Sequence, residues 1–305
     1  MLKTSVVIVN YNGERFLNAC LNSICDSQTP SGFEVIVVDN ASQDGSVALL
    51  KTWQQDAKSH YPQIPVTLIL NADNTGFSYA NNQGIARAKG QFVFLLNNDT
   101  VTQPDCLAKL EQYFENNPES GGLGPCLLNA DGSVQGQGSA VSHFLYKAEK
   151  PKQVSFISGA AFFTTKAILE SIGGLDENYF FYNEDLDLCR TIRVKVGKTL
   201  VYLPEAKLTH FGGLSTATRK PASVIEGYRG GLYFVRKQFG VVVFGLYRMV
   251  LWLEVGPRLL WACIKGLWDA GTRALIPAYL TVLGITLSGN IRFNRMDYKT
   301  PEVVT

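Results

Sequence analysis

The sequence predicts an α/β protein built on a doubly wound, mainly parallel sheet. Apolar runs of the length of buried strands alternate with segments of helical periodicity, which is the pattern of βαβ units. Each apolar run ends in a cluster of Asn, Asp, Ser or Gly, residues that favour turns. Of the 305 residues, 46% are hydrophobic and 18% are charged, so the chain can bury a sizeable core and is not disordered.

The expected elements follow one another along the chain. Strands are predicted at residues 4–9, 33–38, 66–70 and 92–96. Helices with one apolar face are predicted at residues 14–25, 47–58, 79–88 and 103–117. Later segments are β-like at residues 156–164 and helical in pattern at residues 166–172 and 186–196. Residues 118–153 are rich in Gly, Ser and Gln and weakly periodic, which predicts a mobile flap or a short hairpin.

The strand predicted at residues 92–96 is followed by four polar residues, Asn97-Asn98-Asp99-Thr100. A carboxylate flanked by amides at the carboxyl end of a buried strand can hold a hard divalent cation and the phosphates bound to it. The alternative is an Asn/Asp turn that only closes the strand. Polar residues also follow the other predicted strands, at Asn10, Asn12, Asp39, Asp73 and Asn74.

Right-handed crossovers would bring these strand ends to one edge of the sheet. Together they predict a polar pocket of the kind that binds a nucleotide. Two common nucleotide-binding classes are excluded by their motifs. No Gly-x-Gly-x-x-Gly follows the first strand, which argues against a dinucleotide dehydrogenase, and the chain has no Gly-x-x-x-x-Gly-Lys-Ser/Thr P-loop.

Three later segments carry candidate chemistry. Small residues that would let a substrate approach the backbone stand together at Ser158, Gly159 and Ala160. Glu184 and Asp185 open a predicted helix directly after four aromatic residues. They either complement the helix dipole or are partly buried carboxylates, one of which could serve as a general base. His210 is expected in a polar, Gly-rich loop and is either structural or a metal ligand.

Charge and hydropathy divide the chain into two predicted regions. Residues 219–305 hold 12 Lys or Arg against 5 Asp or Glu, although the whole chain has a net charge of only +2. Because these basic residues are interleaved with apolar runs, an anionic membrane surface is a better partner than nucleic acid. We expect a catalytic domain at 1–218 and a helical region at 219–305 lying in the membrane interface. A spanning segment and a soluble dimer interface are the alternatives.

The cysteines and the amino terminus indicate a reducing compartment. Six cysteines are scattered without a Cys-x-x-Cys pair, which argues against a zinc knuckle or a disulfide framework. The apolar stretch at residues 5–9 is too short for a signal peptide and stops at a polar sequence. These features predict a cytoplasmic protein.

The motifs together resemble the family 2 glycosyltransferases of the GT-A fold, especially their bacterial rhamnosyltransferase-like branch. The matching sequences run in family order and cover about residues 4–215. They are Val-Asn-Tyr-Asn-Gly (9–13), Val-Val-Asp-Asn-Ala-Ser-Gln-Asp-Gly-Ser (37–46), Asn-Thr-Gly-Phe-Ser-Tyr-Ala-Asn-Asn-Gln-Gly-Ile (74–85), Leu-Leu-Asn-Asn-Asp (95–99), Ser-Gly-Ala-Ala (158–161), Phe-Tyr-Asn-Glu-Asp-Leu-Asp (181–187) and His-Phe-Gly-Gly-Leu-Ser (210–215).

The resemblance implies a donor subsite. Asp39 resembles the acid that contacts the base of a nucleotide-sugar, and Asn10 and Asn12 would sit at the mouth of that subsite. Asn74 and Asn82 would hold the donor or its loop.

The resemblance also implies a metal site and a base. Asn97-Asn98-Asp99 takes the place of an Asp-x-Asp metal motif; Asn97 replaces the first Asp, and Asp99 is the expected ligand of Mg²⁺ or Mn²⁺. His210 matches a histidine that touches the metal in some members. Glu184-Asp185 matches the acidic pair whose Asp is the base, and Ser158–Ala160 would lie on the acceptor side.

The implied activity is an inverting, metal-dependent glycosyl transfer at the inner face of the cell membrane. The expected donor is dTDP-rhamnose, and the expected acceptor is a glycan or lipid-linked saccharide of cell-surface polysaccharide biosynthesis. One alternative is the same fold with a UDP-hexose or UDP-HexNAc donor. Another is a non-catalytic carbohydrate-binding or partner subunit, which the intact acidic residues disfavour. A nucleotidyltransferase of similar fold is a third, but residues 10–13 carry no basic residue.

Overall fold

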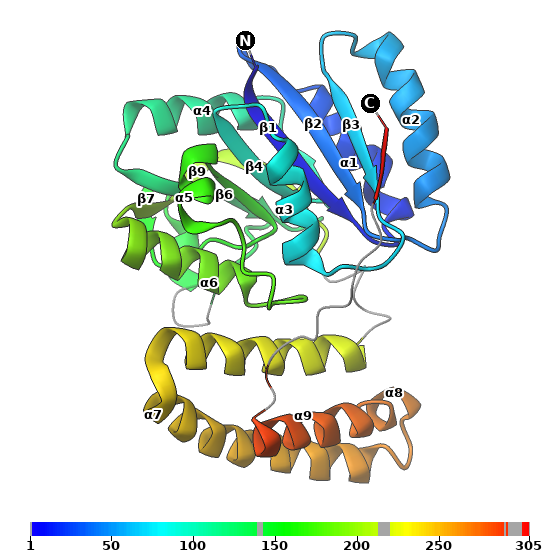
Figure 1. The fold of residues 1–305 in the computed structure, drawn as a ribbon, viewed down its shortest axis with the longest axis vertical. Coiled ribbons are helices and arrows are strands. Elements are labelled where there is room, and N and C mark those ends of the chain that lie inside the picture. Colours follow the sequence, from blue (N-terminus) through cyan, green and yellow to red (C-terminus); the bar gives the residue numbers. More distant parts are fainter. Residues whose placement is uncertain (1, 139–142, 213–219, 290, 292–300, 305) are drawn as a thin grey trace.

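The computed structural model describes residues 2–138, 143–212, 220–289, 291 and 301–304 (Figure 1). Within these residues the strands form one mixed sheet of ten, in the order β10-β3-β2-β1-β4-β8-β6-β9-β5, with β7 on β9. Strands β3, β2, β1 and β4 run parallel, whereas β8 joins β4 antiparallel. The predicted mainly parallel α/β sheet is therefore confirmed.

The amino-terminal half follows the sequence prediction closely. Its elements are β1 (Leu2–Asn10), α1 (Glu14–Cys25), β2 (Gly32–Asp39), α2 (Ser46–His60), β3 (Val66–Leu70), α3 (Phe77–Arg87) and β4 (Phe92–Asn97). The middle of each central strand is apolar on both faces, as at residues 6–9 of β1 and 35–38 of β2, because helices cover both faces of the sheet: α3 lies in front of it in Figure 1 and α1 behind it. Helix α1 buries Leu17, Leu21 and Ile24, the residues whose helical spacing predicted it.

The second half supplies the remainder of the sheet. Its elements are β5 (Thr100–Thr102), α4 (Cys106–Asn116), β6 (Ser120–Leu128), the 3₁₀ turn η1 (His143–Lys147), β7 (Lys152–Val154), β8 (Ala161–Thr165), α5 (Lys166–Ile172), α6 (Glu184–Thr191), the π-helical turn η2 (Ile192–Val196) and β9 (Thr199–His210). The prediction of a flap or hairpin is wrong for β6, which lies inside the sheet between β8 and β9. His210 is likewise not in a loop, because it ends β9.

Glycines explain why β6 escaped prediction. A Cβ at Gly122 would lie 2.6 Å from the Phe162 ring, and a Cβ at Gly124 would lie 2.6 Å from the Ile157 side chain. The strand therefore uses glycine where large side chains press on its backbone, although glycine lowers its intrinsic strand propensity.

The carboxyl-terminal region comprises α7 (Lys220–Lys265), α8 (Ala270–Arg273), α9 (Ile276–Ser288) and β10 (Glu302–Val304). Gly240, at φ 81°, breaks α7 into two arms. In Figure 1 the first arm lies against the sheet domain, and the second arm and α9 form a further layer beyond it. The tail is not wholly helical as expected, because β10 returns to pair with β3. The predicted boundary at residue 218 and the end of the His210 motif, residues 213–215, lie outside the described residues.

The outer layer of the helical region is apolar on its surface. Two stretches, Pro221–Lys265 and Ala270–Ser288, have the length and composition to cross a membrane, which by itself is weak evidence. Some apolar side chains of this region are strongly exposed, with Leu253 at 78% in the first stretch and Trp268 at 80% between the two. A surface of this kind indicates a partner that is itself apolar.

Candidate active site

A cavity of about 320 Å³ lies at the carboxyl ends of the parallel strands. This is the edge where open α/β sheets bind ligands. Most of the residues singled out from the sequence line it, namely Asn74, Asn97, Asn98, Asp99, Ser158, Gly159, Ala160, Glu184, Asp185 and His210. The fold therefore brings together residues that are far apart in the chain.

A chain of hydrogen bonds joins the ends of β4, β1 and β2 beneath this cavity. Asn98 donates from Nδ2 to Asn10 Oδ1 at 2.6 Å, and Asn10 donates from Nδ2 to Asp39 Oδ2 at 2.8 Å. The backbone N–H of Ser42 donates to Asp39 Oδ1 at 2.9 Å. Gly13 makes room for this arrangement, because a Cβ there would lie 2.0 Å from the Asn98 amide.

Asn10 and Asp39 consequently do not face the open cavity. Asn10 is 0% exposed and Asp39 is 1% exposed. The expectation that Asn10 sits at the mouth of a subsite is wrong, since it supports the edge from below. A contact of Asp39 with a base stays a prediction.

The remaining predicted donor residues hold loops. Asn12 links two strand ends, since its N–H donates to Ser42 Oγ and its Oδ1 accepts from the N–H of Gln43. Asn82 donates to the Leu175 carbonyl at 2.8 Å and accepts from the Leu175 N–H at 2.9 Å, so it fixes the loop after α5. Asn74 lies on the cavity wall and accepts from Asn40 Nδ2 at 2.9 Å.

Strand register places Asp99 beside His210. Strand β5 begins directly after Asp99, and its first residue, Thr100, pairs with His210 at the end of β9. The pairing brings His210 Nε2 to 3.3 Å from Asp99 Oδ1. Asp99 is 3% exposed, and its Oδ1 has no hydrogen-bond partner among the described residues.

Gln135 sets the orientation of the His210 ring. Its Oε1 lies 2.7 Å from His210 Nδ1, and its Nε2 donates to Asn129 Oδ1 at 3.1 Å. Since this network assigns Nδ1 as the donor, a neutral ring turns the lone pair of Nε2 towards the lone pairs of Asp99. Two acceptors that converge in this way fit a shared cation, and carboxylate oxygen with imidazole nitrogen is a suitable donor set.

No group of three or more His, Cys, Asp or Glu side chains suited to one ion occurs in the described part of the chain. A cation held by Asp99 and His210 would therefore need oxygen atoms from a substrate or water to complete its coordination. This is the usual state of Mg²⁺ at phosphate-binding sites.

The acidic pair stands on the other wall, at the start of α6. Asp185 Oδ2 accepts a hydrogen bond from the Gly159 N–H at 3.1 Å, and its Oδ1 accepts from the Leu186 N–H at 2.8 Å. Glu184 is 6% exposed, and its Oε2 is buried without a hydrogen-bond partner in the residues described.

These environments favour the protonated forms. Burial, and then the neighbouring Asp185 charge, raise the pKa of Glu184 to about 8. Burial also raises the pKa of Asp185, although the N–H groups of Gly159 and Leu186 oppose the shift. A carboxylate with a raised pKa that faces a cavity is a candidate general base.

An aromatic wall precedes the acidic pair. Phe180, Phe181 and Tyr182 line the cavity, and the chain then turns through two residues in the left-handed region, Tyr182 at φ 72° and Asn183 at φ 69°. Non-glycine residues hold this conformation only where their surroundings impose it. The turn thus aims Glu184 and Asp185 into the site at a conformational cost.

Several lining residues were not predicted from the sequence. Asn40 stands next to Asp39 in a recognised motif and could have been found there. Ser223 and Glu226 come from α7, and no feature of the sequence of the tail connects them to the site. Gln135, which orients His210 and is not a lining residue, was also not predicted, and it lies in the weakly periodic stretch. The sequence alone gives no reason to single out a polar residue in that stretch. Its role follows only from the fold, in which the end of β9 places His210 beside it.

Comparison with known proteins identifies the family. The model of the family described as glycosyl transferase family 2 matches residues 5–173, and that of glycosyl transferase family group 2 matches residues 92–289. An N-acetylglucosaminyl-diphospho-decaprenol L-rhamnosyltransferase of Mycobacterium tuberculosis is 27% identical over 263 residues, which cover 75% of this chain and 82% of that protein.

Solved structures share the fold. The Staphylococcus aureus protein TarS, residues 1–349, in complex with UDP-GlcNAc, matches with a TM-score of 0.58 and 16% identity over 97% of this chain and 94% of that one. A mannosyltransferase of Pyrobaculum calidifontis in complex with GDP-Man and Mn²⁺ matches with a TM-score of 0.58 and 15% identity over 94% and 88% of the two chains. The fold is that of the GT-A enzymes, and the chain belongs to the family 2 glycosyltransferases.

Proposed function

We propose that this enzyme moves a sugar from a nucleoside diphosphate donor to an acceptor hydroxyl with inversion at the anomeric carbon. The observation that carries the proposal is the position of Asp185. Its carboxylate is held by the Gly159 N–H on the wall of the cavity that also contains Asp99 and His210. One wall thus offers a base and the other a site for a cation, which are the two parts that a single displacement needs.

Asp185 would take the proton from the acceptor hydroxyl as that oxygen attacks the anomeric carbon. The N–H groups of Gly159 and Leu186 hold its two oxygens, and so fix the direction in which the carboxylate faces. General base catalysis of this kind is typically worth about 10²–10⁴-fold in rate. Glu184, whose pKa burial raises to about 8, would keep its proton at neutral pH and so avoid a second charge beside the base.

Asp99 and His210 would hold Mg²⁺ or Mn²⁺ together with the diphosphate of the donor. When bound, the ion supplies Lewis-acid neutralisation of the charge that develops on the leaving diphosphate. Gln135 supports this role, because it fixes the His210 tautomer that leaves Nε2 free to bind metal.

The proposed donor is dTDP-rhamnose and the proposed acceptor is a lipid-linked saccharide. The mycobacterial relative supports the rhamnosyl group and the lipid-linked acceptor, since its name specifies an L-rhamnosyl group and N-acetylglucosaminyl-diphospho-decaprenol. A UDP-hexose or UDP-HexNAc donor is the second candidate. It is favoured by a 24% identical stretch shared with a poly(ribitol-phosphate) β-N-acetylglucosaminyltransferase of Staphylococcus aureus.

A donor panel tests these proposals. The purified protein is given dTDP-rhamnose, UDP-glucose or UDP-GlcNAc with a prenyl-diphosphate-linked GlcNAc acceptor, in Mn²⁺, Mg²⁺ or EDTA, and nucleoside diphosphate release is measured. We expect release from dTDP-rhamnose that EDTA abolishes. Release from a UDP-sugar would contradict the proposed donor but leave the proposed mechanism intact. Activity that is undiminished in EDTA would contradict the proposed metal dependence.

We also propose that the second arm of α7 and α9 lie in the interface of the inner membrane leaflet. Large apolar side chains on this layer, including Leu253, Leu267 and Trp268, are more than two-thirds exposed. Basic residues among them, such as Arg258 and Lys265, would meet anionic headgroups. The layer lies on the far side of the first arm of α7 from the sheet (Figure 1), so docking would leave the sheet domain in the cytoplasm.

Vesicle binding tests this setting. Cosedimentation with phosphatidylcholine vesicles should increase when phosphatidylglycerol is added, and Leu253→Glu with Trp268→Glu should reduce it at least tenfold. Val194→Glu is the control, since Val194 is 63% exposed on the sheet domain. Equal binding by all three proteins would contradict the proposed surface. If the protein instead stays with cellular membranes after carbonate extraction, a spanning segment would be favoured.

A further inference from the structure

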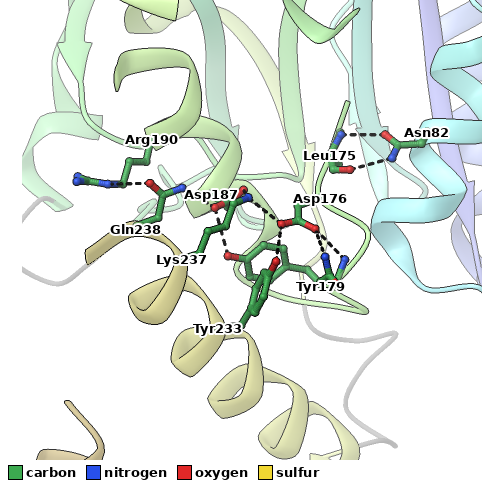
Figure 2. A network of polar contacts seen from close by, with 10 residues as sticks. Asn82, Leu175, Asp176, Tyr179, Asp187, Arg190, Tyr233, Lys237 and Gln238 are labelled. Carbon is green, nitrogen blue, oxygen red and sulfur yellow. Dashed lines mark hydrogen bonds and ion pairs between the residues drawn. The ribbon is translucent and has the colours of Figure 1, made fainter. Parts of the chain in front are cut away.

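A lysine of the carboxyl-terminal region binds the segment that carries the acidic pair. Lys237, on the first arm of α7, donates from Nζ to Asp176 Oδ2 at 2.7 Å and to Asp187 Oδ2 at 2.6 Å (Figure 2). Asp176 precedes the aromatic wall in the chain and Asp187 follows the acidic pair. One cation therefore joins both ends of the segment 176–187.

The lysine does not act alone. Tyr233 donates its hydroxyl to Asp176 Oδ2 at 3.0 Å, and Gln238 donates from Nε2 to Asp187 Oδ1 at 2.7 Å. Figure 2 shows these side chains projecting from α7 towards the two carboxylates. The side chain of Asp187 is only 5% exposed and that of Lys237 is 25% exposed. Breaking this contact would therefore leave a largely buried charge without its partner, which is destabilising.

Lys237 and Asp176 are both held in their charged forms. Burial alone would raise the pKa of Asp176, but hydrogen bonds from Lys237 and Asn178 hold it below its usual value. Burial alone would lower the pKa of Lys237, but its hydrogen bonds to Asp176 and Asp187 raise it. The pair thus stays ionised through the neutral range.

What the lysine holds is a turn that local preferences do not favour. Tyr182 and Asn183 both have left-handed backbone angles. Asn183 is tied to α7 as well, because its Nδ2 donates to the Gly227 carbonyl at 3.0 Å. Directly after this turn come Glu184 and Asp185. A strained turn needs such external contacts to keep its geometry.

We propose that Lys237 is a positioning residue for the acidic pair: by binding Asp176 and Asp187 at once, it holds the turn that aims Asp185 into the cavity. The first arm of α7 is then part of the catalytic machinery and not only a connection to the membrane layer. The inference rests on the proposed function for its effect on catalysis, whereas the effect on the segment itself can be measured without catalysis.

Three variants test the inference. Lys237→Met removes the charge and keeps the length of the side chain, and Lys237→Arg keeps a charge that can reach both carboxylates. Lys109→Met is the matched control, because Lys109 pairs with Asp105 at 2.6 Å on α4, away from the cavity. For each, we would measure kcat and KM of transfer, binding of UDP and of dTDP with Mn²⁺ by calorimetry, the melting temperature, and hydrogen exchange in residues 176–187.

For Lys237→Met we expect kcat to fall about 10²-fold, the loss typical of a misplaced catalytic group, while nucleotide Kd changes less than about twofold. The amides of Tyr179 and Asp187, which donate to the carbonyls of Asp176 and Asn183, should exchange about tenfold faster. Lys237→Arg should restore kcat to within about tenfold of the wild type and the exchange rates to within about twofold. Lys109→Met should match the wild type in both.

Four outcomes would overturn the inference. They are unchanged kcat in Lys237→Met, unchanged exchange of the segment, failure of arginine to restore either readout, and a loss of nucleotide binding and melting temperature that parallels the loss of kcat. If the wild-type protein transfers no sugar, the proposed function fails, and the exchange measurement alone then decides whether Lys237 holds the segment.

Discussion

His210 Nε2 lies 3.3 Å from Asp99 Oδ1, and neither atom carries a hydrogen to share when the imidazole is neutral. Gln135 enforces this arrangement by accepting the hydrogen of Nδ1. In the proposed function this pair of atoms holds a cation, although Asn97 stands where the resemblance implies the first Asp of the metal motif. The contact between Gln135 and Nδ1 of His210 can therefore be tested by mutation.

Replacing Gln135 should weaken metal activation. Gln135→Leu removes the acceptor for Nδ1–H, so the ring loses its fixed orientation, and the Mn²⁺ concentration for half-maximal activity should rise about 10–100-fold. A Mn²⁺ titration of nucleoside diphosphate release measures it. Gln55→Leu, on an exposed position of α2, is the control. An unchanged Mn²⁺ requirement in Gln135→Leu would contradict the proposed role of Gln135 in orienting His210 towards a metal ion.

Glu184 should make stability depend on pH. Because its pKa is about 8 in the folded protein and near 4.5 when unfolded, the folded state holds the extra proton between these values. Its contribution to stability is therefore largest below about pH 4.5 and is lost as the pH rises through about 8.

Glu184→Gln should accordingly gain stability relative to the wild type on going from pH 5 to pH 8, by on the order of 1–4 kcal/mol. Urea unfolding at the two pH values gives the comparison. A difference between the two proteins that does not change with pH would show that Glu184 ionises as freely in the folded state as in the unfolded one.

Gly76 should tolerate no side chain. It has φ +82°, and a Cβ there would lie 2.6 Å from the Phe180 ring and 2.8 Å from the Phe180 carbonyl oxygen. Gly132 has the same φ but no atom within 4 Å of its Cβ position, so it isolates the backbone effect. Gly76→Ala should cost about 1–3 kcal/mol more than Gly132→Ala by urea unfolding. Equal costs would mean that the aromatic wall moves freely.

The sequence was sufficient for the parts of the fold that local pattern controls. The strands at β1 to β4 are apolar on both faces, and their polar ends predicted the cavity edge with Asp99, Asn74 and Asn97. Asn10 also follows a strand but is buried, because a polar residue at a strand end can either face a ligand or hold neighbouring residues. Burial distinguishes the two, and burial is set by Asn98 and Asp39 around it.

Other features depend on contacts between distant residues. Strand β6 contains three glycines whose absence of a side chain is explained by close contacts with distant residues, among them Phe162, Ile157 and Ile192. Strand β10 forms by pairing with β3, which lies more than two hundred residues away in the chain. Gln135, Glu226 and Lys237 reach the site or its supports through the tertiary fold. Sequence periodicity carries no information about such pairings.

The most direct test of the account is Asp185→Asn. The substitution keeps the size of the side chain and one acceptor oxygen, which can still take the hydrogen bond from the Gly159 N–H, but it removes the base. We predict that binding of UDP or dTDP with Mn²⁺ stays within about twofold of the wild type while transfer falls about 10²–10⁴-fold. Equal nucleotide binding with undiminished transfer would contradict the assignment of Asp185 as the base and, with it, the proposed mechanism.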